Sequence, residues 1–250
     1  EFNRVSKSVR PLSSTFKIIP YAAALKEGIK LSDKFEDLPT CWEGYCPKNF
    51  SENYMGKISL VDSFKSSSNI VPIKITKKIG IKKVVNLANS FGLGYKQELQ
   101  EFPSLAIGSY GDTLLNITNA YAVVNSNGRI YNPSTIEKIQ TFSGKKIWEN
   151  KLNSEKILDS KTNKKLKILL EKSVKEGTSS AAFIKGNKIF GKTGTSDGNR
   201  DLWFIGSINN ITTGVWIGFD ENNKSKLSSG NAAYLWRKFI TKIYNLKIKK

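Results

Sequence analysis

Apolar residues recur every three or four positions through most of the first half of the chain. The periodicity begins at Phe16, and Gly28 stands where the first predicted helix would end. The same spacing predicts further helices at 60–64, 70–79, 81–91 and 113–125. Glycine, which commonly ends a helix in the left-handed conformation, follows three of these segments, at positions 80, 92 and 128. The pattern therefore predicts a mainly helical part over about residues 16–126.

The second half of the chain changes to a pattern typical of strands. After one more helical segment at 162–176, the sequence predicts strands at 188–195, 202–208 and 212–219. Asn209-Asn210 between the last two strands favours a tight hairpin. A final amphipathic run, 232–244, would pack Leu235, Phe239 and Ile243 against the sheet. We predict an α/β protein of the α+β kind, in which helices flank an antiparallel sheet over about residues 129–246 and a helical subdomain lies beside it.

The composition limits the chemistry that the chain can perform. Its 250 residues include no histidine, and that absence removes the commonest general base and the commonest metal ligand. Ser-His-Asp catalysis, Cys-His catalysis and most zinc sites are therefore excluded. Catalysis would depend on Ser, Lys, Asp or Glu, and the sequence indicates no cofactor.

The net charge of +19 would suit a partner rich in phosphate or carboxylate. Nearly all of the excess is Lys rather than Arg, and it is spread through a chain that is also rich in Asn and Ile, as AT-rich coding would produce. Proteins that recognise nucleic acid more often cluster arginine and interleave aromatic residues. We therefore favour coding bias and expect no nucleic-acid partner.

The two cysteines, Cys41 and Cys46, flank a short segment that contains a glycine. This spacing would allow a small disulfide loop if the compartment is oxidising. A structural metal is not expected there, because the segment offers no third or fourth ligand. The chain also lacks an apolar run of about 18 residues and a signal-like opening, so we expect this stretch neither to span a membrane nor to carry its own targeting signal.

Ser14-Thr15-Phe16-Lys17 places a hydroxyl at the start of a predicted helix and an amine one turn later. This i,i+3 spacing brings both side chains to one face. Lys17 could accept the proton of Ser14 if burial or a second cation lowers its pKa, and Lys192 is a candidate for that cation. By itself the spacing is weak evidence, because a helix cap followed by a surface lysine is its commoner meaning.

Two further polar motifs follow. Ser67-Ser68-Asn69 falls between two predicted helices, where its side chains would lie on a turn, although an ordinary Asx or Ser turn has the same pattern. Lys192-Thr193-Gly194-Thr195 continues a predicted strand. Gly194 would let a substrate backbone lie close to this strand, and the lysine and threonines around it could hold a carboxylate by charge-assisted hydrogen bonds.

Together the motifs Ser-x-x-Lys, Ser-x-Asn and Lys-Thr-Gly resemble, in order and spacing, the signature of penicillin-binding proteins and serine β-lactamases. Other stretches are similar to class A penicillin-binding proteins, the bifunctional cell-wall synthases, and the resemblance covers essentially the whole chain. These stretches are Phe2-Asn3-Arg4, Arg10, Pro103–Gly108, Asn116–Val124 with Asn127-Gly128, Glu176-Gly177-Thr178, Gly191–Thr195 with Asp201–Gly206, and Val215–Asp220. The resemblance implies one transpeptidase domain over residues 1–250 with a β-lactamase/transpeptidase-like fold.

The activity implied by the resemblance is that of a D,D-transpeptidase of peptidoglycan synthesis. Such an enzyme attacks the terminal D-Ala-D-Ala bond of a stem peptide, forms an acyl-serine, and passes the acyl group to the amine of a neighbouring stem. Penicillins and other β-lactams would be trapped at the same serine. The expected location is extracytoplasmic, at the periplasmic face of the inner membrane or in the cell wall of a bacterium. A membrane anchor and a glycosyltransferase domain are expected upstream in the parent protein.

The resemblance also implies catalytic roles for particular residues. Ser14 would be the nucleophile and Lys17 its base. Ser67 would relay a proton to the leaving amine, and Lys192 would lend positive potential.

Other residues would bind the substrate. Asn69 would hold the substrate amide, whereas Thr193 and Thr195 would grip the carboxylate beside Gly194. The backbone N–H groups of Ser14 and Thr195 would form the oxyanion hole, which is typically worth a few kcal/mol of barrier per donor.

The chain departs from the family pattern in two places. Arg10-Pro11-Leu12-Ser13 stands where the family usually has Arg-Gln-Pro-Gly, so the glycine that eases the turn is missing. Family members also carry sheet strands upstream of the Phe-Asn-Arg segment, whereas this chain begins at Glu1-Phe2. We therefore expect the sheet to lack its first strands.

Several alternatives share these motifs: a class D-like serine β-lactamase, a D,D-carboxypeptidase, and a non-catalytic module that senses penicillin or peptidoglycan. Ser14–Ile18 resembles the corresponding stretch of class D lactamases, in which the base would be a carboxylated Lys17. No Glu-bearing loop of the class A lactamase kind is evident. The similarity after residue 100 favours the penicillin-binding proteins, and the intact motifs argue against a sensor.

Overall fold

The computed structural model describes residues 2–94 and 98–245. The α-helices are α1 (Arg4–Lys7), α2 (Ile18–Lys26), α3 (Leu60–Lys65), α4 (Ile70–Ile79), α5 (Ile81–Ser90), α6 (Leu114–Asn125), α7 (Ser160–Glu176) and α8 (Ser229–Ile243). The 3₁₀ turns are η1 (Ser13–Lys17), η2 (Pro103–Ile107), η3 (Ser180–Ala182) and η4 (Asp197–Asn199). The strands are β1 (Arg10–Pro11), β2 (Lys34–Asp37), β3 (Gly56–Ser59), β4 (Gly111–Asp112), β5 (Arg129–Tyr131), β6 (Lys138–Gln140), β7 (Lys146–Glu149), β8 (Ser154–Lys156), β9 (Ile189–Thr195), β10 (Asp201–Ile208) and β11 (Ile211–Gly218).

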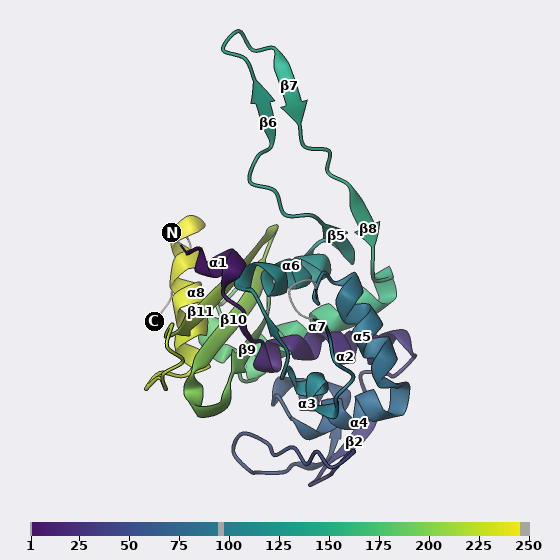
Figure 1. Cartoon of the computed structure of the whole chain (residues 1–250). Coiled ribbons are helices and arrows are strands. Elements are labelled where there is room, and N and C mark those ends of the chain that lie inside the picture. The colour runs from purple at the N-terminus through teal and green to yellow at the C-terminus, as the bar shows by residue number, and fades with distance from the viewer. Residues whose placement is uncertain (1, 95–97, 246–250) are drawn as a thin grey trace.

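The helices and strands predicted from the apolar pattern are confirmed, with ends that shift by at most three residues. The glycines predicted to end helices, Gly80, Gly92 and Gly128, all have positive φ. The α+β prediction is confirmed as well, because helices surround an antiparallel sheet with the strand order β11-β10-β9 (Figure 1).

The central strand β10 is buried along its whole length, and its side chains alternate between two cores. Trp203 and Ile205 join the core of the helical cluster. Phe204 and Ile208 face the opposite way and pack with Trp236 of α8, whose ring meets that of Phe204 edge-on at a centroid distance of 5.2 Å. The sheet is therefore covered on both faces, by the helical cluster and by α8 (Figure 1).

The prediction of which face of α8 packs against the sheet is wrong. Leu235, Phe239 and Ile243 are about half exposed, and the helix buries Trp236 and Ile240 with the small residues Ala232 and Ala233. Both sets recur every four positions, so helical spacing alone fits either face. The large indole of Trp236 fills the space beside Phe204, where glycines at 191 and 206 leave room for aromatic rings.

Helix α2 lies at the centre of the helical cluster and is apolar on all sides. Every residue from Ile18 to Leu25 is buried, which is expected of a helix surrounded by others. Lys17 directly precedes this helix at the end of η1 and is buried with it. The helix that fills the core therefore also carries an amine into the interior.

Four pairs of strands, β1-β4, β2-β3, β5-β8 and β6-β7, have no counterpart in the sequence prediction, and two of them stand out in the fold. β2 and β3 form a short antiparallel ladder in which Asp37 pairs with Gly56. β6 and β7 form an arm that extends away from the rest of the fold (Figure 1). Their residues are largely charged or exposed, so neither pair shows the apolar alternation of a half-buried strand.

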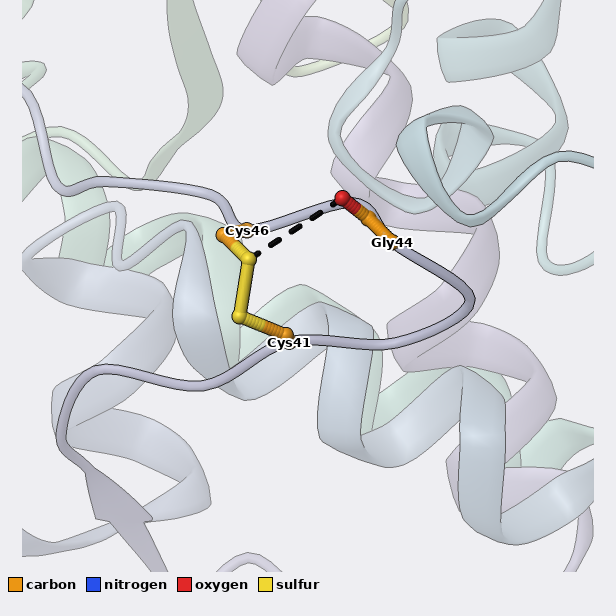
Figure 2. Close-up of a disulfide and its surroundings, with 3 residues drawn as sticks. All are labelled: Cys41, Gly44 and Cys46. Carbon is orange, nitrogen blue, oxygen red and sulfur yellow. Dashed lines mark hydrogen bonds between the residues drawn. A yellow bond between two sulfur atoms is a disulfide. The ribbon is translucent and has the colours of Figure 1, made fainter.

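Cys41 and Cys46 form a disulfide within the segment that connects β2 to β3, as the sequence allowed. It closes a tight hairpin (Figure 2). In this hairpin the backbones of Trp42 and Tyr45 exchange two hydrogen bonds of 2.9 Å. The central Glu43 and Gly44 both have positive φ, as a type I′ turn requires. The dashed line in Figure 2 joins Sγ of Cys46 to the Gly44 carbonyl oxygen at 4.0 Å. This contact is not a hydrogen bond, because a disulfide sulfur has no proton to donate.

Within residues 2–94 and 98–245, no helix has both the length and the apolar character needed to cross a bilayer. The same residues contain no group of three or more Cys, Asp or Glu side chains placed to hold a metal ion.

Reduction of the Cys41–Cys46 disulfide should lower the free energy of unfolding by about 2 kcal/mol, because a closed loop of this length restricts the unfolded chain to that extent. Urea unfolding with and without dithiothreitol measures the difference. The Cys41→Ser/Cys46→Ser variant should unfold like the reduced protein and should not respond to dithiothreitol. An equal midpoint for the oxidised and reduced wild-type protein would show that the loop adds no stability.

Candidate active site

The turn that carries Ser14 is held from both sides by backbone hydrogen bonds. Leu12 N–H donates to the Tyr110 carbonyl at 2.9 Å, and Ser13 N–H donates to the Gly108 carbonyl at 2.8 Å. On the other side the hydroxyl of Tyr121 donates to the Thr15 carbonyl at 2.8 Å. Ser14 itself is half-buried at the surface of this fixed turn.

Ser13 adopts the left-handed conformation, with a φ of 51°. The family pattern has a glycine at this position, and the turn forms here with serine, at a cost of about 1 kcal/mol for a residue with a Cβ atom. A glycine does face the turn from η2. A Cβ added to Gly108 would lie 2.0 Å from the Ser13 carbonyl oxygen, and Gly108 itself has a φ of 85°. The close approach of these two backbones therefore requires glycine at position 108.

Lys17, which follows Ser14 by one turn, is completely buried. Its Nζ donates to the Ser67 carbonyl at 2.7 Å and to Oδ1 of Asn69 at 2.7 Å, and lies 3.4 Å from the Ser67 hydroxyl. Burial lowers the pKa of Lys17 well below its usual value, the charge of Lys192 lowers it further, and Asp37 acts in the opposite direction. The interior therefore favours a neutral Lys17.

Lys192 on β9 is also completely buried. Its Nζ contacts the Ser67 hydroxyl at 2.9 Å, the Thr178 hydroxyl at 3.3 Å and the Thr193 carbonyl at 3.1 Å. Burial lowers the pKa of Lys192 to about 7. The Ser67 hydroxyl thus lies between two buried amines.

The turn at residues 67–69 brings both polar ends of the motif to Lys17. Ser67 has a left-handed φ of 60°, which turns its hydroxyl and its carbonyl towards the lysines. The side chain of Asn69 donates through Nδ2 to the Lys48 carbonyl at 2.7 Å. Since the amide group of Asn69 is fixed at that end, its oxygen faces Lys17.

β9 lies at one edge of the three-stranded sheet and runs beside η1. Thr193 donates through Oγ1 to the Thr178 hydroxyl at 3.2 Å, and its N–H donates to the Ser179 hydroxyl at 3.1 Å. A Cβ added to Gly194 would lie 3.0 Å from the Leu12 carbonyl oxygen. The sequence predicts that Gly194 makes room for a substrate backbone, and the structure places the turn that carries Ser14 against this glycine.

The structure thus brings the sequence-predicted residues of the three motifs together. Lys17, Ser67, Asn69 and Lys192 are joined directly by hydrogen bonds, and Gly194 packs on the turn of Ser14. In the part of the chain that the structure describes, no hydrogen bond joins the Ser14 hydroxyl to Lys17, whose two short contacts go to Ser67 and Asn69.

Comparison with known proteins identifies the family, because residues 2–234 match the penicillin binding protein transpeptidase domain. The chain belongs to the penicillin-binding protein transpeptidase family. It is 29% identical to penicillin-binding protein 1A of Rickettsia prowazekii over 249 residues, which cover 88% of this chain and 31% of that protein. It is 31% identical to penicillin-binding protein 1A of Aquifex aeolicus over 256 residues, which cover 98% of this chain and 35% of that protein. The chain therefore spans about a third of the length of these relatives.

Solved structures of penicillin-binding proteins share the fold. Penicillin-binding protein 1A from Haemophilus influenzae matches all of this chain and 44% of its own, with a TM-score of 0.88 and 23% identity. Penicillin-binding protein A from M. tuberculosis, solved as an imipenem acyl-enzyme complex, matches 96% of this chain and 61% of its own, with a TM-score of 0.84 and 21% identity. The predicted β-lactamase/transpeptidase-like fold is confirmed.

Some residues of the site in this penicillin-binding domain had no assigned role from sequence. Thr178 belongs to a stretch that resembles the family, but only the structure shows that it accepts hydrogen bonds from Lys192 and Thr193. Asp37 and Asn49 lie outside every motif, and no local pattern marks them. Asp37 accepts a hydrogen bond from Ser68 and Asn49 from Asn69, residues distant in sequence, so the sequence carries no local signal for these contacts.

The Gly108→Ala substitution should lower the free energy of unfolding by about 3 kcal/mol, because the new methyl group overlaps the Ser13 backbone and the left-handed φ is also strained. Gly144→Ala is the matched control, since Gly144 has a φ of 84° and an added Cβ there meets nothing within 4 Å. The control should lose only about 1 kcal/mol. Urea unfolding of both variants makes the comparison, and equal losses would contradict the proposed overlap.

Proposed function

We propose that this chain is a peptidoglycan D,D-transpeptidase domain that works through an acyl-serine at Ser14. One observation carries the proposal: a completely buried Lys17, whose pKa burial lowers well below its usual value, follows Ser14 by one turn and shares Ser67 with a second buried lysine. A serine needs such a base to become a nucleophile, and a lysine serves only when its pKa is lowered. The family membership supports the same reaction.

The hydrogen bonds of Lys17 suit the role of a base. A neutral amine has two N–H donors and one lone pair. The Ser67 carbonyl and Oδ1 of Asn69, both at 2.7 Å, accept from the two N–H groups. The lone pair is then left to accept the proton of Ser14.

In the proposed acylation step, Oγ of Ser14 attacks the carbonyl carbon of the terminal D-Ala-D-Ala bond while Lys17 takes its proton. The C–N bond then breaks, and the leaving amine receives a proton through the hydroxyl of Ser67. That hydroxyl contacts Lys17 at 3.4 Å and Lys192 at 2.9 Å, which suits a relay. The amine of a neighbouring stem peptide next attacks the acyl-serine and returns Ser14 to its starting state.

Substrate binding is assigned to β9 and to the 67–69 turn. An extended peptide would lie along the free edge of β9, where main-chain hydrogen bonds give affinity. Thr193 and Thr195 would grip its carboxylate in the positive potential of Lys192. Asn69 would hold the substrate amide, and the N–H groups of Ser14 and Thr195 would form the oxyanion hole.

We propose a parent protein of the penicillin-binding protein 1A kind, with a membrane anchor and a glycosyltransferase domain, that acts outside the cytoplasm of a bacterium. Residues 1–250 would form its transpeptidase domain, with the helical part over about 16–126 and the sheet part over about 129–246. The similarity to Rickettsia and Aquifex proteins of that name supports this assignment. β-lactams would acylate Ser14, as imipenem forms an acyl-enzyme with the M. tuberculosis protein.

Incubation with penicillin should add one penicillin mass to the wild-type chain and none to the Ser14→Ala variant, because Ser14, one turn before Lys17, is the proposed nucleophile. Intact-protein mass spectrometry measures the adduct. Ser13→Ala, in the adjacent position, should retain it. An adduct on Ser14→Ala would exclude Ser14 as the nucleophile, and release of the adduct within seconds would favour a β-lactamase.

The rate of acylation by penicillin should fall above a pH of about 7, because Lys192, with its pKa of about 7, then loses the charge that holds the substrate carboxylate. The rate should also fall at low pH, where Lys17 becomes protonated. In Lys192→Gln the alkaline fall should disappear. The acid fall should move to higher pH, since the charge that lowers the pKa of Lys17 is gone.

Stopped-flow measurement of the second-order acylation constant between pH 5 and 9 gives both profiles. Lys175→Gln, which changes an exposed lysine of α7, is the control and should reproduce the wild-type profile. A Lys192→Gln profile that coincides with that of the wild type would show that Lys192 does not act on the reaction through its charge.

A further inference from the structure

A buried carboxylate lies directly behind the 67–69 turn. Asp37, the last residue of β2, is completely buried. It accepts hydrogen bonds from the Ser68 hydroxyl at 2.6 Å, from Nδ2 of Asn49 at 3.0 and 3.1 Å, and from the N–H of Met55 at 2.9 Å. Every one of these donors is neutral.

The salt bridges among the described residues do not include Asp37. A buried carboxylate without a cation in contact is costly unless a positive charge lies within reach. Among the groups whose charge acts on Lys17, Asp37 is the negative one, opposite Lys192 on β9. The charge of Asp37 also acts on Tyr21. Burial raises the pKa of Tyr21 above its usual value, and Asp37 raises it further, so the Tyr21 hydroxyl stays neutral. Two charges of opposite sign therefore act on Lys17: the positive charge of Lys192 on β9 and the negative charge of Asp37 on β2.

Asn49 connects this carboxylate to the motif. Its Nδ2 binds Asp37, and its Oδ1 accepts the N–H of Asn69 at 2.8 Å. The neighbouring Lys48 carbonyl accepts from Nδ2 of Asn69 and so directs Oδ1 of Asn69 to Lys17. Asp37 and Asn49 thus bind both Ser68 and Asn69, the two residues that complete the turn after Ser67.

We propose that Asp37 and Asn49 are positioning residues for acylation: Asn49 fixes Asn69 against Lys17, and Asp37 holds that arrangement through its hydrogen bonds to Ser68 and Asn49. This inference rests on the proposed function of Ser14 and Lys17. Asp37 counteracts Lys192, so the two charges together decide how basic Lys17 remains. A purely structural role would affect stability alone.

Asp37→Asn keeps the shape of the side chain and removes its charge. The acid limb of the acylation profile should move to lower pH by roughly 0.5 to 1 unit, because Lys17 loses the charge that favours its protonated form. Asp112→Asn is the matched control: Asp112 is also completely buried and accepts from a hydroxyl, a backbone N–H and an Asn amide, but it is not among the charges that act on Lys17. The acid limb of the control should stay at the wild-type position.

Asn49→Ala tests the geometric part, since it leaves the charge of Asp37 in place. The rate constant at saturating penicillin should fall roughly tenfold, as expected when a catalytic group is misplaced, and the acid limb should stay where it is in the wild type. Asn163→Ala removes another buried amide, bonded to the Val124 carbonyl at 3.1 Å, and should leave that rate constant unchanged. If Asp37→Asn does not fold, Asn49→Ala alone decides, and a wild-type rate constant would overturn the proposal.

The titration of Lys17 itself separates this inference from the proposed function. NMR of protein labelled with ¹³C at lysine Cε, with Lys17 assigned from the Lys17→Arg spectrum, follows its protonation without any substrate. The midpoint should be lower in Asp37→Asn than in the wild type, and equal midpoints would overturn the role of Asp37. Failure of the wild type to take up penicillin at Ser14 would instead overturn the proposed function, while the NMR titration would still decide the role of Asp37.

Discussion

The burial of two amines on either side of one hydroxyl is the constraint on which the rest of the structure depends. Removal of an ammonium group from water costs several kcal/mol unless it is paired or neutralised. Lys17 and Lys192 are both completely buried, and each meets oxygen acceptors that the backbone fixes in place. The side chain of Lys17 exposes no surface to solvent. The fold therefore maintains an electrostatic state that the same residues would not have in water.

Local backbone strain sets the positions of those acceptors. Ser13 and Ser67 both adopt left-handed conformations that residues with a Cβ atom seldom take. Groups from distant parts of the chain help to hold both turns. Backbone groups of the 108–110 segment hold the first, and the side chain of Asn49 binds the second. Strain of this kind persists where the surroundings over-determine the conformation, and it gathers at functional sites.

The main elements and the motifs of the site could be predicted because their signals are local. Helical spacing placed α4 at residues 70–79 with its observed ends, and a Ser-x-x-Lys spacing needs only four consecutive residues. The inner face of α8 was predicted wrongly because two apolar stripes satisfied the same period, and only the partner Phe204 distinguishes them. Asp37 and Asn49 were not predicted for a related reason: their proposed roles depend on hydrogen bonds with Ser68 and Asn69, which are distant in the chain. Local pattern thus predicts elements, whereas contacts between elements decide which polar residue has a role.

The position of Gly194 against the turn of Ser14 has a consequence for how the protein is made. A Cβ at Gly194 would lie 3.0 Å from both Leu12 and Thr15, so the two segments are packed together although about 180 residues separate them in the chain. Contacts of such high sequence separation form late in folding. During synthesis the serine leaves the ribosome long before β9 does, and domains generally fold as units. Until β9 is in place, Lys17 lacks the charge of Lys192 that lowers its pKa further, so an incomplete chain carries every residue of the first motif without the charge that completes its surroundings.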